Sequence, residues 1–108
     1  MLILLDQATP VLIRKFLVGH KVETAAQRHW DKLQNGALLT AAEKAGFEVF
    51  LTPDKNIKYQ QNLKNRAISI IVLSNAQWPA LQDHEQLVVD AVNAAKPGTY
   101  SEIEIPAK

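Results

Sequence analysis

The nearly uninterrupted apolar run AISIIVL at residues 67–73 constrains the fold more than any other feature of the chain. A run of this length, rich in β-branched residues and without polar alternation, is typical of a strand that is buried on both faces. Such strands belong to parallel sheets that helices cover on both sides, because the strands of a half-exposed sheet alternate instead. Two shorter runs, LILL at 2–5 and FEVFL at 47–51, predict further strands of the same sheet.

Helical patterns separate these strands. Thr9 is expected to cap a first helix, with Pro10 at the first helical position, and Gly19 is expected to end it. Residues 26–34 are expected to form a loop or an irregular turn. Three further helices are expected, at residues 35–44, 55–64 and 78–95.

The resulting order alternates strand and helix along the whole chain. Two weaker strand patterns complete it, at residues 21–25 and at 100–105, where YSEIEI alternates polar and apolar as an edge strand does. This alternation predicts an α/β fold with a parallel sheet of five strands and helices on both faces. A chain of 108 residues suffices for one domain, over residues 1–108, and no linker or repeat divides it.

Composition excludes several classes of protein. The chain has no cysteine, which excludes a disulfide scaffold, a zinc ribbon and a thiol nucleophile. No apolar run approaches the roughly 20 residues that span a bilayer, and the opening MLILL is too short for the core of a signal peptide. The three histidines lack metal-ligand spacing, and there is no glycine-rich phosphate loop. We therefore expect a cytoplasmic domain without a membrane partner.

Two aspartates follow the ends of predicted strands. Asp6 comes directly after the first strand and Asp54 just after the third. Ligands of open parallel sheets bind beyond the carboxyl ends of the strands, where the strand order reverses, so the two carboxylates converge if these strands are neighbours. Such a pair suits Mg²⁺ or Mn²⁺ and predicts metal-binding and catalytic roles for both aspartates. Each also has a purely structural interpretation, Asp54 as a helix cap and Asp6 as a turn residue.

Basic and amide residues accompany this pair. Residues 1–66 carry 10 basic and 6 acidic residues, a net charge of +4, whereas residues 67–108 carry 2 and 5, a net charge of −3. The densest basic stretch predicts nucleic-acid contacts, although a solvated helix face explains it as well. The predicted phosphate contacts are Lys55, Lys58 and Lys64, and the supporting polar residues are Asn56, Gln60 and Ser74.

The segment TPDKNIKYQQNLKNRAISIIVL at 52–73 resembles the strand–TxDKN–helix–YQQNL–strand segment of the small bacterial PIN-like proteins of the DUF5615 type. The opening ILLDQATP and the block HWDKLQNGALLTAAEKAGFEVFLT at 29–52 resemble that family too, so the resemblance covers essentially the whole chain. It implies a PIN-like three-layer α/β/α sandwich with a mainly parallel sheet. It also implies a Mg²⁺- or Mn²⁺-dependent endoribonuclease, the toxin of a toxin–antitoxin pair, with RNA and an antitoxin-like protein as partners.

The chain departs from the family's pattern near the expected site. The family has D-E-N after the first strand, where this chain has Gln7 and Ala8 after Asp6, and the family's acidic residue at the start of the second helix is Ala37 here. Glu43 lies about 600° of helical turn further on and is a poor substitute. An incomplete acidic site predicts weak or absent cleavage, because several carboxylates share the work of holding the metal. The alternative is an inactive PIN-like module that binds a partner protein or RNA. A homodimer through helical surfaces is also expected.

Overall fold

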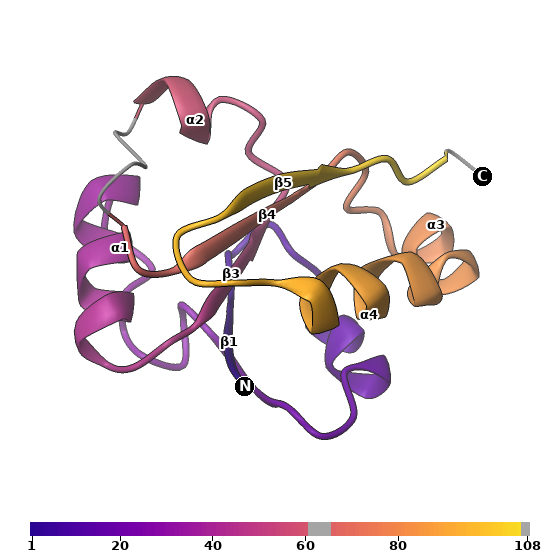
Figure 1. Cartoon of the computed structure of the whole chain (residues 1–108), viewed down its shortest axis with the longest axis horizontal. Coiled ribbons are helices and arrows are strands. Elements are labelled where there is room, and N and C mark those ends of the chain that lie inside the picture. The colour runs from indigo at the N-terminus through magenta and orange to yellow at the C-terminus, as the bar shows by residue number, and fades with distance from the viewer. Residues whose placement is uncertain (61–65, 107–108) are drawn as a thin grey trace.

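The protein is a five-stranded parallel sheet covered by helices on both faces (Figure 1). The computed structural model describes residues 1–60 and 66–106, without the side chains of residues 35, 59 and 60. Strand order across the sheet is β2-β1-β3-β4-β5, and every neighbouring pair is parallel. The strands are β1 (Leu2–Leu5), β2 (Lys21–Thr24), β3 (Val49–Thr52), β4 (Ser69–Leu73) and β5 (Tyr100–Ile103). The predicted α/β class and parallel sheet are confirmed, and the architecture is consistent with a PIN-like sandwich.

The two faces of the sheet bury separate apolar clusters. All residues of β3 and β4 are buried, as the run at 67–73 predicted. Successive side chains point to opposite faces, so Leu51 and Ile71 join one cluster while Phe50 and Ile70 join the other. The helices on the first face are η1 (Val11–Phe16), α3 (Trp78–Asp83) and α4 (Glu85–Ala94), and those on the second are α1 (Asn35–Lys44) and α2 (Ile57–Gln60).

Two of the predicted helices differ from the observed ones. The helix expected at 78–95 is divided in two at His84, whose φ of −129° and ψ of 33° lie outside the helical region. The N–H of His84 donates to the carbonyl of Leu81, which closes α3, and its own carbonyl accepts from Leu87, which starts α4. Of the helix expected at 55–64, the described part begins only at Ile57, and residues 61–65 lie outside the described chain.

The first helix is a short 3₁₀ helix, and its predicted cap is wrong. Pro10 is the residue before the helix rather than its first helical residue, and it has an extended ψ of 130°. Thr9 does not cap the helix, because its hydroxyl turns inward and donates to the carbonyl of Leu51 at 3.2 Å. A buried hydroxyl needs a partner, and the neighbouring strand offers one. Among the described helices none is long and apolar enough to cross a membrane.

Arg66 joins the entry of β4 to α1. Its guanidinium lies 2.7 Å from a carboxylate oxygen of Glu43 and also donates to the Thr40 hydroxyl and the Gly36 carbonyl. The other oxygen of Glu43 accepts from the Ala67 N–H at 2.8 Å. Burial alone would raise the pKa of Glu43, but the bonds from Arg66 and Ala67 together outweigh burial, so this pKa lies below its usual value.

We predict that Glu43→Gln destabilises the protein by about 1–2 kcal/mol at pH 7, because it replaces a charge-assisted contact at a side chain that is 21% exposed. A carboxyl whose pKa is lowered by folding stabilises the protein above its unfolded pKa of about 4.3, and this contribution is lost as the pH falls through the lower folded pKa. The difference between the two proteins should therefore shrink below about pH 4. Urea unfolding across this pH range measures it.

The matched control is Glu104→Gln, which makes the same change at an exposed glutamate that follows β5. We expect it to alter stability by less than about 0.5 kcal/mol at either pH. A loss in Glu43→Gln that stays the same from pH 7 to pH 3 would contradict the assigned ion pair.

Candidate functional site

The strand order reverses between β1 and β3. From β1 the chain passes to β2 on one side, and later enters β3 on the other side. Leu5 is in register with Leu51, and the N–H of Asp6 donates to the carbonyl of Leu51 at 3.0 Å. Asp6 therefore stands at the carboxyl end of β1, beside the end of β3 from which Asp54 follows. The two strands are thus neighbours, the condition that the sequence analysis left open, and the loops of both aspartates lie at the switch point of the sheet.

Thr52 links the two aspartates. Its side chain is fully buried (0% exposed), and its hydroxyl donates to Asp6 Oδ2 at 2.7 Å while accepting from the Asp54 N–H at 3.1 Å. Asp6 Oδ1 also accepts from the Gln7 N–H at 2.8 Å, and Asp54 Oδ1 from the Asn56 N–H at 2.9 Å. Each carboxylate is thus oriented by a local backbone donor, and one hydroxyl joins the two loops.

Sequence analysis did not identify Thr52. The available signal was a threonine at the end of a buried apolar strand, two residues before an aspartate, since a buried hydroxyl must bond to something near it. The structural interpretations of the aspartates are also met in part. Asp54 closes an Asx turn just before α2, and Asp6 binds the next residue's N–H in its turn. A carboxylate offers about four acceptor sites, so these bonds are compatible with a further ligand on Asp6.

The predicted lysines occupy different surroundings. Lys55 is exposed at the same rim, directly after Asp54. Lys58 is held by Glu102 of β5 at 3.2 Å, and its ammonium lies 5.8 Å from the centre of the Tyr100 ring. The hydrogen bond from Tyr100 and, next, that from Lys58 lower the pKa of Glu102. Lys64 and the side chain of Gln60 lie outside the described residues.

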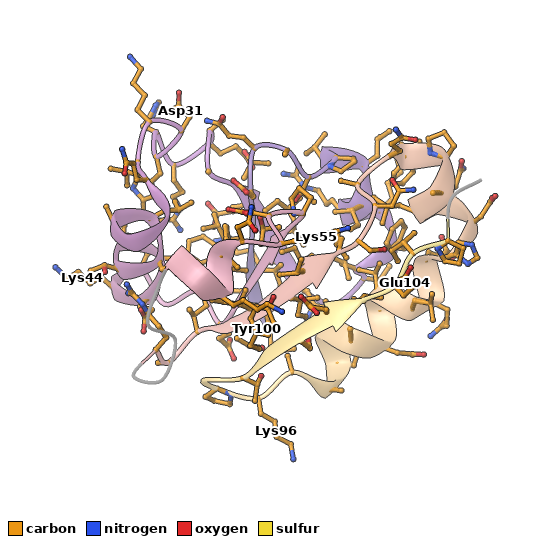
Figure 2. All side chains as sticks on the ribbon, turned by 90° about the horizontal axis from the view of Figure 1, so that it is seen from above. Asp31, Lys44, Lys55, Lys96, Tyr100 and Glu104 are labelled. Carbon is orange, nitrogen blue, oxygen red and sulfur yellow. The ribbon has the colours of Figure 1, made fainter. Side chains whose placement is uncertain are left out.

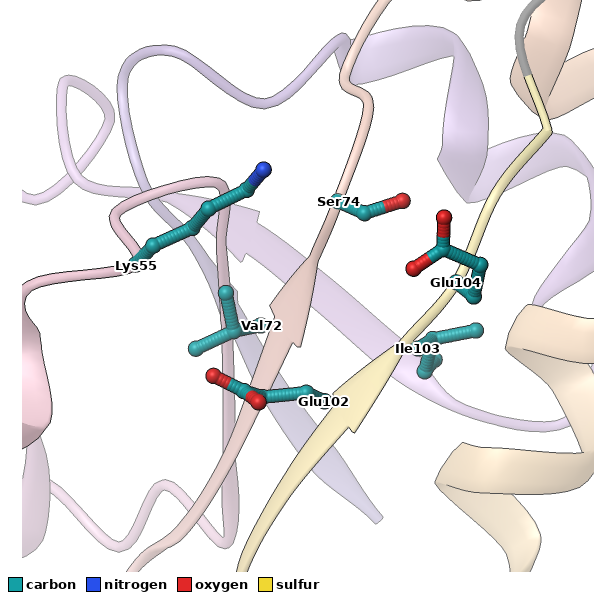
Figure 3. A pocket seen from close by; sticks show the side chains of 6 residues that line it. All are labelled: Lys55, Val72, Ser74, Glu102, Ile103 and Glu104. Atoms are coloured by element: carbon teal, nitrogen blue, oxygen red, sulfur yellow. The ribbon is translucent and has the colours of Figure 1, made fainter.

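Ser74 joins the ends of β4 and β5. Its N–H donates to the Ile103 carbonyl at 2.9 Å, and its hydroxyl accepts from the Ile105 N–H at 2.6 Å. It does not reach the aspartates through these bonds, but it lines a cavity of about 330 Å³ at the same rim (Figure 3). The cavity is lined by Lys55, Val72, Ser74, Glu102, Ile103 and Glu104. In Figure 2, Glu104 lies at the arrowhead end of β5, whereas Lys96 lies near its beginning.

The site has two carboxylates rather than a larger cluster. Within the described chain, no three His, Cys, Asp or Glu side chains lie together as metal ligands. Ala37 is exposed on α1, and Glu43, the poor substitute, is engaged by Arg66. Asp31 approaches the rim through its backbone, where its carbonyl accepts from the Gln7 amide at 2.7 Å. Two carboxylates fit the donor chemistry of Mg²⁺, which keeps several waters and needs only one or two protein carboxylates.

We predict that Thr52→Val lowers the free energy of unfolding by about 2–3 kcal/mol, because it removes the donor to Asp6 and leaves the Asp54 N–H without its acceptor. Thr9→Val is the matched control, since it makes the same change at a second buried threonine. The control should cost only about 1 kcal/mol, because the Leu51 carbonyl that Thr9 contacts still accepts from Asp6. Denaturant unfolding measures both. Equal losses would show that Thr52 is an ordinary buried threonine.

Comparison with known proteins adds no relative to this picture. No family model, no curated protein and no solved structure matches the chain. The interpretation of the site therefore depends on its own geometry, which is the pair of aspartates at the switch point, the hydroxyl that joins their loops, and the adjacent cavity.

Proposed function

We propose that this chain is a metal-dependent ribonuclease of the PIN-like type, with Asp6 and Asp54 as its catalytic metal ligands. The observation that carries the proposal is the Thr52 bridge, which joins two acidic loops at the switch point of a parallel sheet. A helix cap or a turn needs no buried hydroxyl that bonds to a second acidic loop, whereas Thr52 bonds to both loops. Oriented carboxylates at a switch point are the arrangement that a hard cation and a phosphate need.

The residues of the chain have separate tasks in this proposal. Asp6 and Asp54 would hold Mg²⁺ or Mn²⁺, which supplies a more acidic water and stabilises charge on a phosphodiester. Thr52 and the backbone N–H groups of Gln7 and Asn56 keep the two carboxylates oriented. Lys55, exposed beside Asp54, attracts the phosphates of the RNA by charge. Lys58 has a smaller part, because Glu102 already neutralises it.

We predict that Asp6→Asn and Asp54→Asn each lower RNA cleavage in Mn²⁺ by at least about 100-fold, because an amide is a much weaker ligand for a hard cation than a carboxylate. A fluorescently labelled single-stranded RNA reports the rate, and excess chelator should abolish it. Asp90→Asn, an exposed aspartate on α4, is the matched control and should leave the rate unchanged. Equal cleavage by the native protein and both site variants would exclude these residues as the site.

The second candidate is an inactive PIN-like module that binds RNA or a protein. It is favoured by one observation, that among the described residues no third carboxylate groups with Asp6 and Asp54 as a metal ligand, and an exposed Ala37 stands where the resemblance implies one. Ala37→Glu separates the candidates in the same cleavage experiment. If only this variant cleaves RNA, the natural chain is a binding module. If the native protein already cleaves, the second candidate is wrong.

A groove with both apolar and charged side chains gives the expected homodimer a specific surface. The groove has a volume of about 410 Å³ and runs between η1 and the helices α3 and α4. Phe16 and Trp78 stack within it, with ring centres 5.8 Å apart, and Val18 at its border is 84% exposed. Lys15 and Glu85 both line it. A two-fold axis through the groove would bring Lys15 of each copy to Glu85 of the other, so we place a second copy of the chain here.

We predict that Val18→Asp converts a dimer to a monomer at micromolar concentration, because it puts a charge into the apolar contact. Light scattering after size-exclusion chromatography measures the mass. Leu33→Asp is the matched control, since Leu33 is an exposed apolar loop residue that does not line the groove. A native protein that stays monomeric at high concentration would rule out this interface.

A further inference from the structure

The cavity at the ends of β4 and β5 has no part in holding the metal under the proposed function. Strands β1, β3, β4 and β5 are consecutive neighbours, so their ends form a row along one rim. Adjacent strands lie about 4.8 Å apart, which puts the end of β4 about 10 Å from that of β1. A nucleic-acid strand that follows the rim past Asp6 and Asp54 therefore brings its next nucleotide to this cavity.

The lining of the cavity is polar at its two sides and apolar between them. Figure 3 shows Lys55 on one side and Glu104 on the other, with Val72 and Ser74 between them. Val72 is almost fully buried and Ile103 partly so. A flat ring can lie against the exposed part of Ile103, and 330 Å³ is at the lower end of the range for small-molecule pockets, about 300–1,000 Å³.

The two glutamates of the lining are not equivalent. Glu102 already accepts from Lys58 at 3.2 Å and from the Tyr100 hydroxyl at 3.0 Å. Glu104 is exposed and makes no hydrogen bond or ion pair to another described residue. An ionised carboxylate only accepts hydrogen bonds, so the group that Glu104 binds must bring N–H or O–H donors. A phosphate is repelled there and is drawn to Lys55 on the opposite side.

We propose that this cavity binds the nucleobase next to the cleaved phosphate, and that Glu104 selects guanine over uracil. Guanine presents two adjacent donors, its N1–H and its amino group, which match the two oxygens of one carboxylate. Uracil presents a single N–H between two carbonyl oxygens, and a carboxylate repels those oxygens. Bases of single-stranded RNA are read on this edge. The inference rests on the proposed function for its substrate, but it concerns different residues.

The test uses guanosine and uridine 5′-monophosphate with the native protein, in chelator and without metal. Titration is followed by the amide NMR signals of residues that line the cavity. We expect the guanine nucleotide to bind at least about fivefold more tightly, the lower bound for a good bidentate contact to a base. Glu104→Gln should remove this preference, while Glu48→Gln, the same change at an exposed glutamate outside the cavity, should keep it.

Equal binding of the two nucleotides, or an unchanged preference in Glu104→Gln, overturns the inference. Because no metal is present, the outcome does not depend on cleavage. A protein that prefers the guanine nucleotide but never cleaves RNA would exclude the nuclease and keep the base site. A protein that cleaves RNA through Asp6 and Asp54 without any base preference would do the reverse.

Discussion

The parallel pairing of β1 with β3 is the constraint on which the rest of the molecule depends. It pairs Ile3 with Val49, 46 positions further along the chain, without any direct turn between the two strands. The segment between these strands must therefore cross over, and it does so through β2 and α1. This crossing creates the reversal of strand order at which the loops of Asp6 and Asp54 lie. The same pairing separates the two apolar clusters, because its side chains alternate between the faces.

Backbone N–H groups and one buried hydroxyl orient the two acidic loops. Asp6 is approached by the Thr52 hydroxyl and the Gln7 N–H, and Asp54 by the Asn56 N–H. These donors hold each carboxylate in a fixed orientation. Lys55 lines the adjacent cavity, where its charge favours a phosphate.

Local sequence patterns predicted the helices and strands whose apolar residues recur with the period of that element. The run at 67–73 contains β4, and the helix at Asn35–Lys44 has the predicted bounds. The same patterns gave wrong predictions where a residue far away in the sequence determines the local structure. Thr9 resembles a helix cap in the sequence, but its hydroxyl bonds to Leu51, 42 positions away. The break at His84 is likewise invisible to a helical pattern that continues on both sides of it.

In the candidate site, too, some residues could be predicted from local sequence and others could not. The positions of Asp6 and Asp54 at one rim could be predicted, because each lies within two residues of a strand end and neighbouring parallel strands end at a shared rim. Thr52 and Glu104 could not, since their roles depend on which strands are neighbours. The order β1-β3-β4-β5 is what brings Glu104, from the far end of the chain, onto the rim that Asp6 begins. Contacts that cross between strands also hold this rim in shape, because Ser74 ties β4 to Ile105 and Lys58 ties the α2 segment to Glu102.

Rigidity of this kind bears on how the proposed site could hold a cation with two carboxylates. A cluster of several acidic residues binds a cation through many ligands. Two carboxylates can bind it well only if neither side chain has to change its conformation on binding. Thr52 supplies that preorganisation here, because one buried hydroxyl restrains Asp6 directly and Asp54 through its backbone. The exposed Ala37 leaves the α1 side of the rim uncharged. Fewer protein ligands leave more of the coordination shell to water and phosphate, which favours binding of substrate over tight retention of the metal. The metal affinity of such a site should therefore depend more on RNA than that of a site with a complete acidic cluster.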